Sequence, residues 1–414
     1  MSGHVPRPGR MHDVRSHPVA GRLTIALAAV LMCVATLAMP ATAQSTPSDA
    51  EVLERPEELE PGASGARRTR PRAAPTDPYV LAHYYIWFEA TSWNRAKKDF
   101  PLLGRYTSDE TTIMRGHVRA AKEVGIDGFI VSWKSTEVLD PRLEQLIDIA
   151  DDEDFKLAIT YQSLDFNRDP LPVRRIVDDL DLFIERYADR KPFKLFGAPL
   201  VALTGTWSFS AQDIGRITSH RREDLQILAT AKNVEDYLRV ADHVDGNLYY
   251  WSSVNPDRYP DYPDKLMAMG DTVRSRGGLW IAPAAPGFDA RQVGGTSVVA
   301  RGDGATLRRE WDGALASLPH AIGLISWNEF SENTHIEPSS SFGTRYLEVV
   351  ADLTGAPEPT AVLFDSDGSL IATQRGTGLF DTGPARVAMT VVFTLGVAVG
   401  ALMLGRRRSE RVVD

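Results

Sequence analysis

The stretch Gly-Phe-Ile-Val-Ser-Trp at residues 128–133 shows the pattern that decides the fold. It carries no charge, and a helical pattern follows it over residues 142–150. An uninterrupted apolar run of this length is typical of a strand covered on both faces, as the strands of parallel sheets are. The stretch therefore indicates one strand–helix unit.

Eight such units fill residues 78–354. We expect strands at residues 79–85, 128–133, 156–161, 199–203, 225–229, 246–251, 279–283 and 322–327. We expect the helices that follow them at residues 109–124, 142–150, 173–188, 211–219, 234–241, 262–276, 306–318 and 343–353. Eight units predict an α/β fold, a single (β/α)8 TIM barrel, rather than an open doubly wound sheet. The first strand also lacks the glycine-rich phosphate loop of dinucleotide-binding folds.

Charge and cysteine content exclude several classes of protein. The net charge of −9 argues against nucleic acid as a partner, because phosphate binding needs a basic surface. The single cysteine, Cys33, lies in the first apolar run. If that run is removed, disulfides, cysteine-ligated metals and thiol nucleophiles are excluded.

The start of the chain has the pattern of a signal peptide. Basic residues precede an apolar core at residues 23–39, and an Ala-Thr-Ala motif follows at residues 41–43. This order predicts a signal peptide at residues 1–43 with cleavage after the motif, and an uncleaved anchor helix is the alternative. Met11 is an alternative start to Met1, because the intervening residues add nothing that the signal requires.

The other end has the pattern of a membrane anchor. Residues 387–404 form an uncharged apolar run about long enough to span a bilayer. The tail at residues 405–414 is basic, and by the positive-inside rule it stays cytoplasmic. We therefore expect a transmembrane helix, with the barrel outside the cell. Residues 44–77 are expected to be a disordered linker, and residues 355–386 a stalk, a linker or a small strand pair.

Aromatic residues recur where the predicted strands end, which is the face of a barrel that carries the active site. Their rings can stack on a sugar while their polar groups bind its hydroxyls. Any single ring is more often a packing residue, but recurrence at several strand ends favours a carbohydrate site. The candidate substrate-binding residues at or beyond these ends are His83, Tyr85, Trp87, Trp133, Tyr161, Trp251, Asp289, Asn328, His335 and Glu337.

Glu329 and Glu332 are the candidate catalytic residues. Hydrolysis of a glycosidic bond uses two carboxyl groups, one as proton donor and one as base or nucleophile. Residues three apart point to opposite faces of a strand, but in a helical turn they lie about 5–6 Å apart. We therefore expect the chain to curl directly after Asn328, so that both carboxylates enter the mouth. The alternative is that one of the two glutamates is an acidic residue at the start of a helix and that the other is a charged residue on the surface.

The sequence around this pair resembles glycoside hydrolase family 99, the endo-α-mannosidases. Residues 327–338 read Trp-Asn-Glu-Phe-Ser-Glu-Asn-Thr-His-Ile-Glu-Pro, and the family pattern reads Trp-Asn-Glu-Trp-His-Glu-Gly-Thr-Gln-Ile-Glu-Pro. The likeness continues at residues 83–88, 125–133 and 286–289.

The resemblance implies a retaining hydrolase that needs neither a metal nor an organic cofactor. Glu329 would act as a base on the substrate 2-hydroxyl, and Glu332 would act as general acid and base. The resemblance also implies four substrate contacts, through Tyr85, Trp87, Trp133 and Asp289.

Two observations leave the substrate open. Phe330, Ser331, Asn333 and His335 replace Trp, His, Gly and Gln of the family pattern. Residues 81–84 and 125–129 also resemble family 71, the α-1,3-glucanases. We expect an α-mannosidic bond cleaved with retention, and an α-glucan is the alternative.

The expected partners are a polysaccharide or glycan and, through the single C-terminal helix, a membrane. We expect a monomer. A different class of protein, a non-catalytic cell-surface barrel that binds carbohydrate, is the alternative function. The presence of both glutamates disfavours it. A glycosyltransferase-associated barrel is disfavoured by the external placement and by the lack of a nucleotide-phosphate motif.

The topology gives the first testable prediction. If residues 387–404 anchor the chain with the barrel outside, protease added to intact cells should release a soluble fragment that contains residues 78–354. Immunoblotting of the supernatant measures this release, and a cytoplasmic protein serves as the control for lysis. A barrel that stays protected in intact cells would contradict the prediction.

Overall fold

The computed structural model describes residues 73–165, 167–359, 361–364 and 370–373. The predicted signal peptide and transmembrane helix lie outside these ranges, so export and anchoring stay predictions. Within the described ranges, no helix is long and apolar enough to cross a membrane.

Eight parallel strands form the central sheet. They are β1 (Tyr79–Tyr85), β2 (Gly128–Trp133), β3 (Lys156–Tyr161), β4 (Leu200–Leu203), β5 (Gln226–Leu228), β6 (Gly246–Leu248), β7 (Leu279–Ala284) and β10 (Ala321–Leu324). They lie in the order β5-β4-β3-β2-β1-β10-β7-β6. A parallel bridge between Ala229, just after β5, and Asn247 of β6 brings the two edge strands together and closes the barrel.

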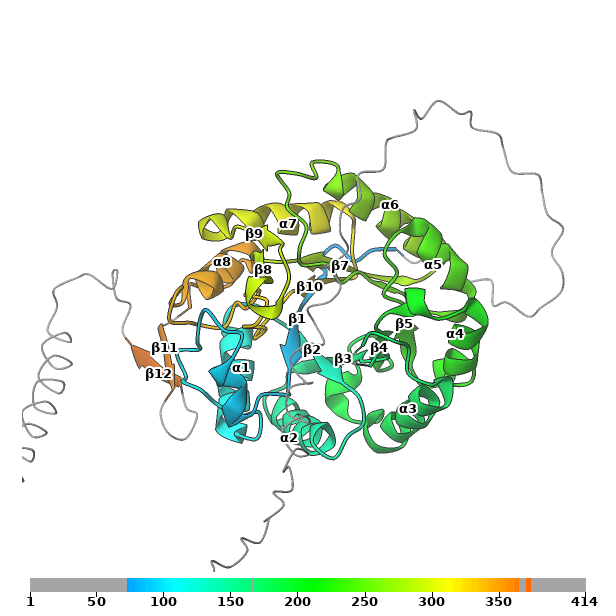
Figure 1. Cartoon of the computed structure of the whole chain (residues 1–414), viewed down its shortest axis with the longest axis horizontal. Helices are drawn as coiled ribbons and strands as arrows, with labels where there is room; N and C mark the ends of the chain where they lie inside the picture. Colours follow the sequence, from blue (N-terminus) through cyan, green and yellow to red (C-terminus); the bar gives the residue numbers. More distant parts are fainter. Residues whose placement is uncertain (1–72, 166, 360, 365–369, 374–414) are drawn as a thin grey trace, which may run out of the picture.

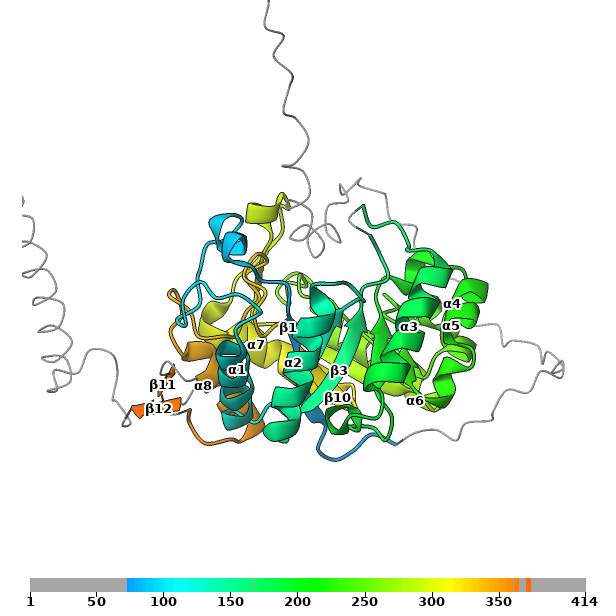
Figure 2. The ribbon, with the colours of Figure 1, turned by 90° about the horizontal axis from the view of Figure 1, so that it is seen from below.

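Eight α-helices surround this barrel (Figure 1). They are α1 (Thr111–Glu123), α2 (Leu139–Asp152), α3 (Val173–Tyr187), α4 (Ala211–Thr218), α5 (Val234–Val240), α6 (Tyr262–Ser275), α7 (Ala305–Ala316) and α8 (Arg345–Thr354). The side view in Figure 2 shows α1, α2 and α3 packed against the outside of the strands. The predicted (β/α)8 barrel is therefore confirmed, and its element boundaries lie within a few residues of those predicted.

Alternation along the strands separates two layers of core. In β1, Leu81 belongs to the buried cluster inside the barrel, whereas Ala82 and Tyr84 belong to the cluster between the sheet and the helices. Successive side chains of a strand point to opposite faces, so His83 and Tyr85 continue the inward row of Leu81. The inner cluster is built from Leu81, Ile130, Ala158, Leu200, Ala202, Leu228, Leu248, Leu279, Ile281 and Ala321, with Leu195 beside them.

Two short antiparallel pairs lie outside the barrel sheet. β8 (Phe288–Asp289) pairs with β9 (Val298–Val299), which the sequence pattern did not predict. β11 (Ala361–Phe364) pairs with β12 (Leu370–Thr373), so the small strand pair expected as one possibility for residues 355–386 is present.

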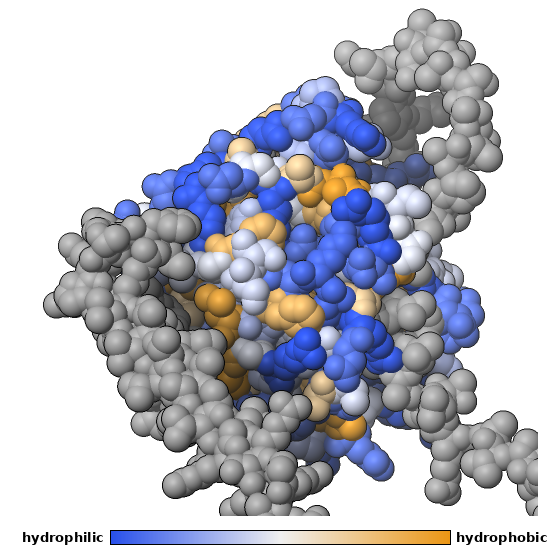
Figure 3. All heavy atoms as spheres, turned by 60° about the vertical axis from the view of Figure 1, so that its left-hand side comes forward, coloured by the Kyte–Doolittle hydropathy of each residue, from blue (hydrophilic) through white to orange (hydrophobic). Residues whose placement is uncertain are grey.

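The face shown in Figure 3 is mostly hydrophilic, with scattered apolar residues between charged ones. Scattered apolar residues are normal for a protein surface. The expectation of a monomer stays a prediction.

Candidate active site

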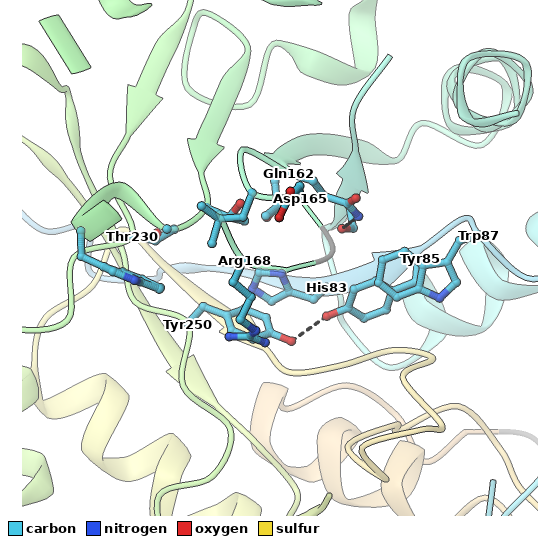
Figure 4. A pocket seen from close by; sticks show the side chains of 14 residues that line it. His83, Tyr85, Trp87, Gln162, Asp165, Arg168, Thr230 and Tyr250 are labelled. Carbon is cyan, nitrogen blue, oxygen red and sulfur yellow. Dashed lines mark hydrogen bonds between the residues drawn. The ribbon is translucent and has the colours of Figure 1, made fainter. Parts of the chain in front are cut away.

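A cavity opens at the carboxyl ends of β1 to β6. Figure 4 shows the side chains that line it, with a hydrogen bond of 2.6 Å between the hydroxyls of Tyr85 and Tyr250. The lining residues are His83, Tyr85, Trp87, Ser132, Thr160, Gln162, Leu164, Asp165, Arg168, Thr204, Gly205, Trp207, Thr230 and Tyr250. Rings and small polar groups thus alternate around one space at the mouth of the barrel.

Three of the predicted substrate-binding residues lie in this cavity: His83, Tyr85 and Trp87. The rings of Tyr85 and Trp87 stack with centroids 4.4 Å apart, and His83 meets Tyr250 edge to face at 4.7 Å. Burial lowers the pKa of His83 to about 3, so its imidazole is neutral at physiological pH. A neutral imidazole can accept or donate a hydrogen bond to a sugar hydroxyl.

Three other residues that the sequence predicts to bind substrate lie outside the lining of this cavity. Trp133 and Tyr161 are fully buried between sheet and helices. Trp133 donates to Asp140 of α2 at 2.9 Å, and Tyr161 donates to Asp179 of α3 at 2.9 Å. Trp251 packs against the same outer core.

The physical reason for this placement is the two-residue period of a strand. Ser132, Thr160 and Tyr250 face the cavity, so the residue after each of them faces the helices. The aromatic residues at the strand ends therefore belong to both rows, and only those of the inward row reach the cavity. Extending the inward rows would have found the polar lining residues Ser132, Thr160, Gln162, Thr204 and Thr230, together with Tyr250.

Glu332 lies on a turn that begins a few residues after β10, and Glu329 directly precedes this turn. Both side chains are buried, and neither is among the residues that line the cavity. The turn covers residues 330–333, so the predicted curl after Asn328 is present. The backbone N–H of Glu329 donates to Ser326 Oγ at 2.8 Å, and Ser331 N–H donates to Glu329 Oε1 at 2.8 Å. These two hydrogen bonds hold both the backbone and the carboxylate of Glu329.

Asn328 holds this turn against β1. Its Oδ1 accepts from Tyr85 N–H at 2.9 Å, and its Nδ2 donates to Tyr85 C=O at 3.0 Å. Asn328 is fully buried and therefore positions the turn, whereas the sequence analysis expected it to bind substrate.

Glu337 also lies behind the site instead of lining the cavity. Its Oε2 accepts from Tyr106 at 2.8 Å, and its Oε1 lies 3.1 Å from His117 Nε2. His117 Nδ1 is in turn 3.0 Å from Tyr84, on the outer row of β1. This buried network braces the segment after the turn, and substrate contact by Glu337 stays a prediction.

The loop between β1 and α1 covers the turn through three successive residues. Lys97 donates to Ser331 Oγ at 2.6 Å, and Lys98 forms an ion pair with Asp289. Asp99 lies 3.0 Å from His335 Nε2. Two of the predicted substrate-binding residues therefore contact this loop. They are Asp289 and His335.

Burial raises the pKa of both glutamates, but their surroundings differ. The positive charge of Lys97 and the N–H and hydroxyl of Ser331 counteract this rise at Glu329. At Glu332 the negative charge of Glu329 raises the pKa further, and the charge of Arg168 only partly offsets it. Glu332 Oε1 has no hydrogen-bond partner among the described residues.

Sequence reasoning missed Lys97 and Arg168. Both lie on loops, where the spacing of residues predicts no direction for a side chain.

The described ranges hold no group of three His, Cys, Asp or Glu residues that could bind a metal ion.

Two buried carboxyl groups after the last strand of a (β/α)8 barrel, beside a cavity of rings and hydroxyls, are features that glycoside hydrolases use. Residues 103–349 match the model of glycosyl hydrolase family 71, and the chain belongs to that family. No curated protein matches the sequence.

Solved structures show the same fold. The family 99 endo-α-mannosidase of Bacteroides thetaiotaomicron, in complex with bis-tris-propane, aligns with a TM-score of 0.59 at 17% identity. A second structure of the Bacteroides thetaiotaomicron enzyme gives 0.59 at 16% identity. Each alignment covers 67% of this chain and 97% of the other. The likeness to families 71 and 99 expected from the motifs is therefore confirmed.

The contact of Lys97 generates a prediction about pH. Replacing Lys97 by Met removes the positive charge that lowers the pKa of Glu329, so this pKa should rise further. If Glu329 must be ionised, activity is lost as the pH falls through its pKa, and the acidic limb of the kcat/KM profile should move to higher pH.

Lys98→Met is the matched control, because it removes the same charge one residue further on, from the ion pair with Asp289. The acidic limb of the kcat/KM profile of Lys98→Met should stay at the wild-type pH, even if the substitution changes the rate. The assignment would be contradicted if the two variants shifted the limb equally or if neither shifted it.

Proposed function

We propose that the protein hydrolyses α-glycosidic bonds in a polysaccharide or glycan, with Glu332 as the general acid and Glu329 as the base. The supporting observation is that the charges around the two carboxyls differ, although burial raises the pKa of both. A proton donor needs a raised pKa, and the buried Glu332 beside the charge of Glu329 has one. A base needs to be ionised, and Lys97 favours the ionised form of Glu329.

The cavity supports a sugar as the ligand. Tyr85, Trp87 and Trp207 offer rings for the C–H faces of a pyranose, and Gln162 and Thr204 offer polar groups for its hydroxyls. A ring stack combined with short polar side chains suits a ligand that is apolar on its faces and polar around its edge.

For the substrate we propose an α-mannoside cleaved with retention. The support is the Trp-Asn-Glu…Glu motif and the likeness in fold to the endo-α-mannosidase structures. In that chemistry Glu329 removes the proton of the 2-hydroxyl, whose oxygen attacks the anomeric carbon while Glu332 protonates the leaving oxygen. Water, deprotonated by Glu332, then opens the resulting 1,2-anhydro sugar at the anomeric carbon, Glu329 returns the proton to the 2-oxygen, and the two displacements together retain the configuration. This requires the 2-oxygen and the leaving oxygen to be trans and axial, which an α-mannoside provides and an α-glucoside does not.

A second candidate, an α-1,3-glucan, is favoured by the match to family 71. The 2-oxygen of an α-glucoside is equatorial and cannot attack from behind. Glu329 would then activate a water molecule, and the anomeric configuration would invert. Glu332 keeps the role of proton donor in both candidates.

The proposal includes a location outside the cell, at the membrane surface. It is supported by the Ala-Thr-Ala motif at residues 41–43 and by the basic tail after residue 404. Such a location suits a polymer that does not enter the cell.

The roles of the two glutamates are tested by amide substitution. Glu329→Gln and Glu332→Gln should each lower kcat by about 10²–10⁴-fold, because a positioned acid or base contributes about that much. Thermal unfolding should change little, since both residues lie on the turn at the mouth rather than within a strand. The exposed Glu348→Gln of α8 is the control for the chemical change. Near-normal turnover in both variants would contradict the assignment.

The product anomer separates the two substrates. Following digestion by NMR, we expect an α-configured reducing end to appear first from an α-mannan. A β-configured product from an α-1,3-glucan would instead establish the second candidate. Binding of either polymer with no hydrolysis by the wild-type protein would indicate the non-catalytic carbohydrate-binding barrel.

A further inference from the structure

Arg168 brings a guanidinium group to the cavity. It lies on the loop after β3, and Figure 4 shows its side chain reaching from this loop towards Tyr250. The acid in the same loop, Asp165, turns back on its own backbone, because its Oδ1 accepts from Asn167 N–H at 2.8 Å and from Asp169 N–H at 2.9 Å. Asp165 and Arg168 both line the cavity, and these hydrogen bonds hold the Asp165 Oδ1 against its own loop.

The backbone of Arg168 has an uncommon conformation. Its φ is +70°, in the left-handed region that residues other than glycine and asparagine seldom adopt. Such a conformation costs free energy and tends to be kept where it serves a ligand site. Here it accompanies a guanidinium group directed into the cavity.

A second cation lies beside the same cavity. The Nζ of Lys232 is 4.0 Å from the ring centroid of Trp207, which is a lining residue. Burial lowers the pKa of Lys232, and the charge of Arg168 contributes to the lowering. Arg168 also acts on the catalytic carboxyl of Glu332. One guanidinium group is thus within electrostatic reach of both the proton donor and the Trp207–Lys232 pair.

We propose that Arg168, with Lys232 beside it, recognises an anionic group, a carboxylate or a phosphate, on a sugar bound in the cavity next to the cleaved bond. The inference rests on the proposed function and adds the charge of its substrate. A guanidinium fork binds either group through two parallel hydrogen bonds. The bound anion also offsets the repulsion between the two cations.

The overall charge makes this site distinctive. The chain carries a net charge of −9, so its average surface repels an anionic polymer. A local cationic site in a recessed cavity attracts one anionic group of the glycan, while the rest of the surface does not attract anions or repels them. Recognition then depends on the position of the charge along the glycan and not on its total charge.

The experiment compares matched substrates. α-Linked tetrasaccharides of mannose and of glucose are prepared neutral, with 6-phosphate on the non-reducing sugar, or with that sugar oxidised to the uronic acid. For each protein, the ratio of kcat/KM for the charged form to that for the neutral form is measured. Because the ratio is taken within one protein, a general loss of activity cancels.

For the wild-type protein we expect a ratio of about 10 or more for one of the two anions, since hydrogen bonds to charged groups discriminate by about that factor. Arg168→Gln should bring the ratio towards one. Arg168→Lys, which keeps the charge but not the fork, should give an intermediate ratio. Arg175→Gln is the matched control: it removes a guanidinium paired with Asp179, outside the lining, and should keep the wild-type ratio.

Binding is measured independently of turnover. Calorimetry with the Glu332→Gln protein should give a tighter Kd for the charged tetrasaccharide, and adding Arg168→Gln should abolish the difference. A wild-type ratio near one, or a preference that survives Arg168→Gln, overturns the inference. A shift of the pH profile in Arg168→Gln with an unchanged ratio also overturns it, because Arg168 would then act only on Glu332. Charge-selective binding without hydrolysis would support the inference while the proposed function fails.

Discussion

The paired hydrogen bonds between the Asn328 side chain and both backbone groups of Tyr85 hold the site together. Asn328 directly precedes Glu329 and the turn that carries Glu332, and Tyr85 ends the first strand of the barrel. An amide side chain can satisfy a backbone donor and a backbone acceptor at once, as a neighbouring strand would. The turn is thereby attached to β1 although β10 itself has already ended at Leu324.

Other contacts surround this attachment on two sides. Behind it, Glu337 joins His117 and Tyr106 in a buried network in which each polar group has a partner. In front, the loop after β1 reaches over the turn with Lys97 and Asp99. Hydrogen-bonded buried polar groups rigidify their surroundings, so the segment that carries the two glutamates and the carboxylate of Glu329 are held in place.

This rigidity matters because both glutamates are buried. Removing water makes each nearby charge more effective, and so a single lysine and a short N–H contact are enough to make two neighbouring carboxyls different. For the same reason, the charge of Arg168 lowers the pKa of Glu332 and of Lys232. The electrostatic character of the site thus follows from few residues, placed by loops from three parts of the chain.

The sequence by itself determined the barrel, because each apolar run and each helical face is a local pattern repeated eight times. It also determined the catalytic pair as a candidate and the curl that follows Asn328, since Glu329 and Glu332 are three residues apart. Only the tertiary structure decided which aromatic residues reach the cavity: Trp133 and Tyr161 lie on the outer rows of their strands. It alone placed Lys97 and Arg168, because a loop side chain has no periodicity, and its partners come from segments far away in the chain.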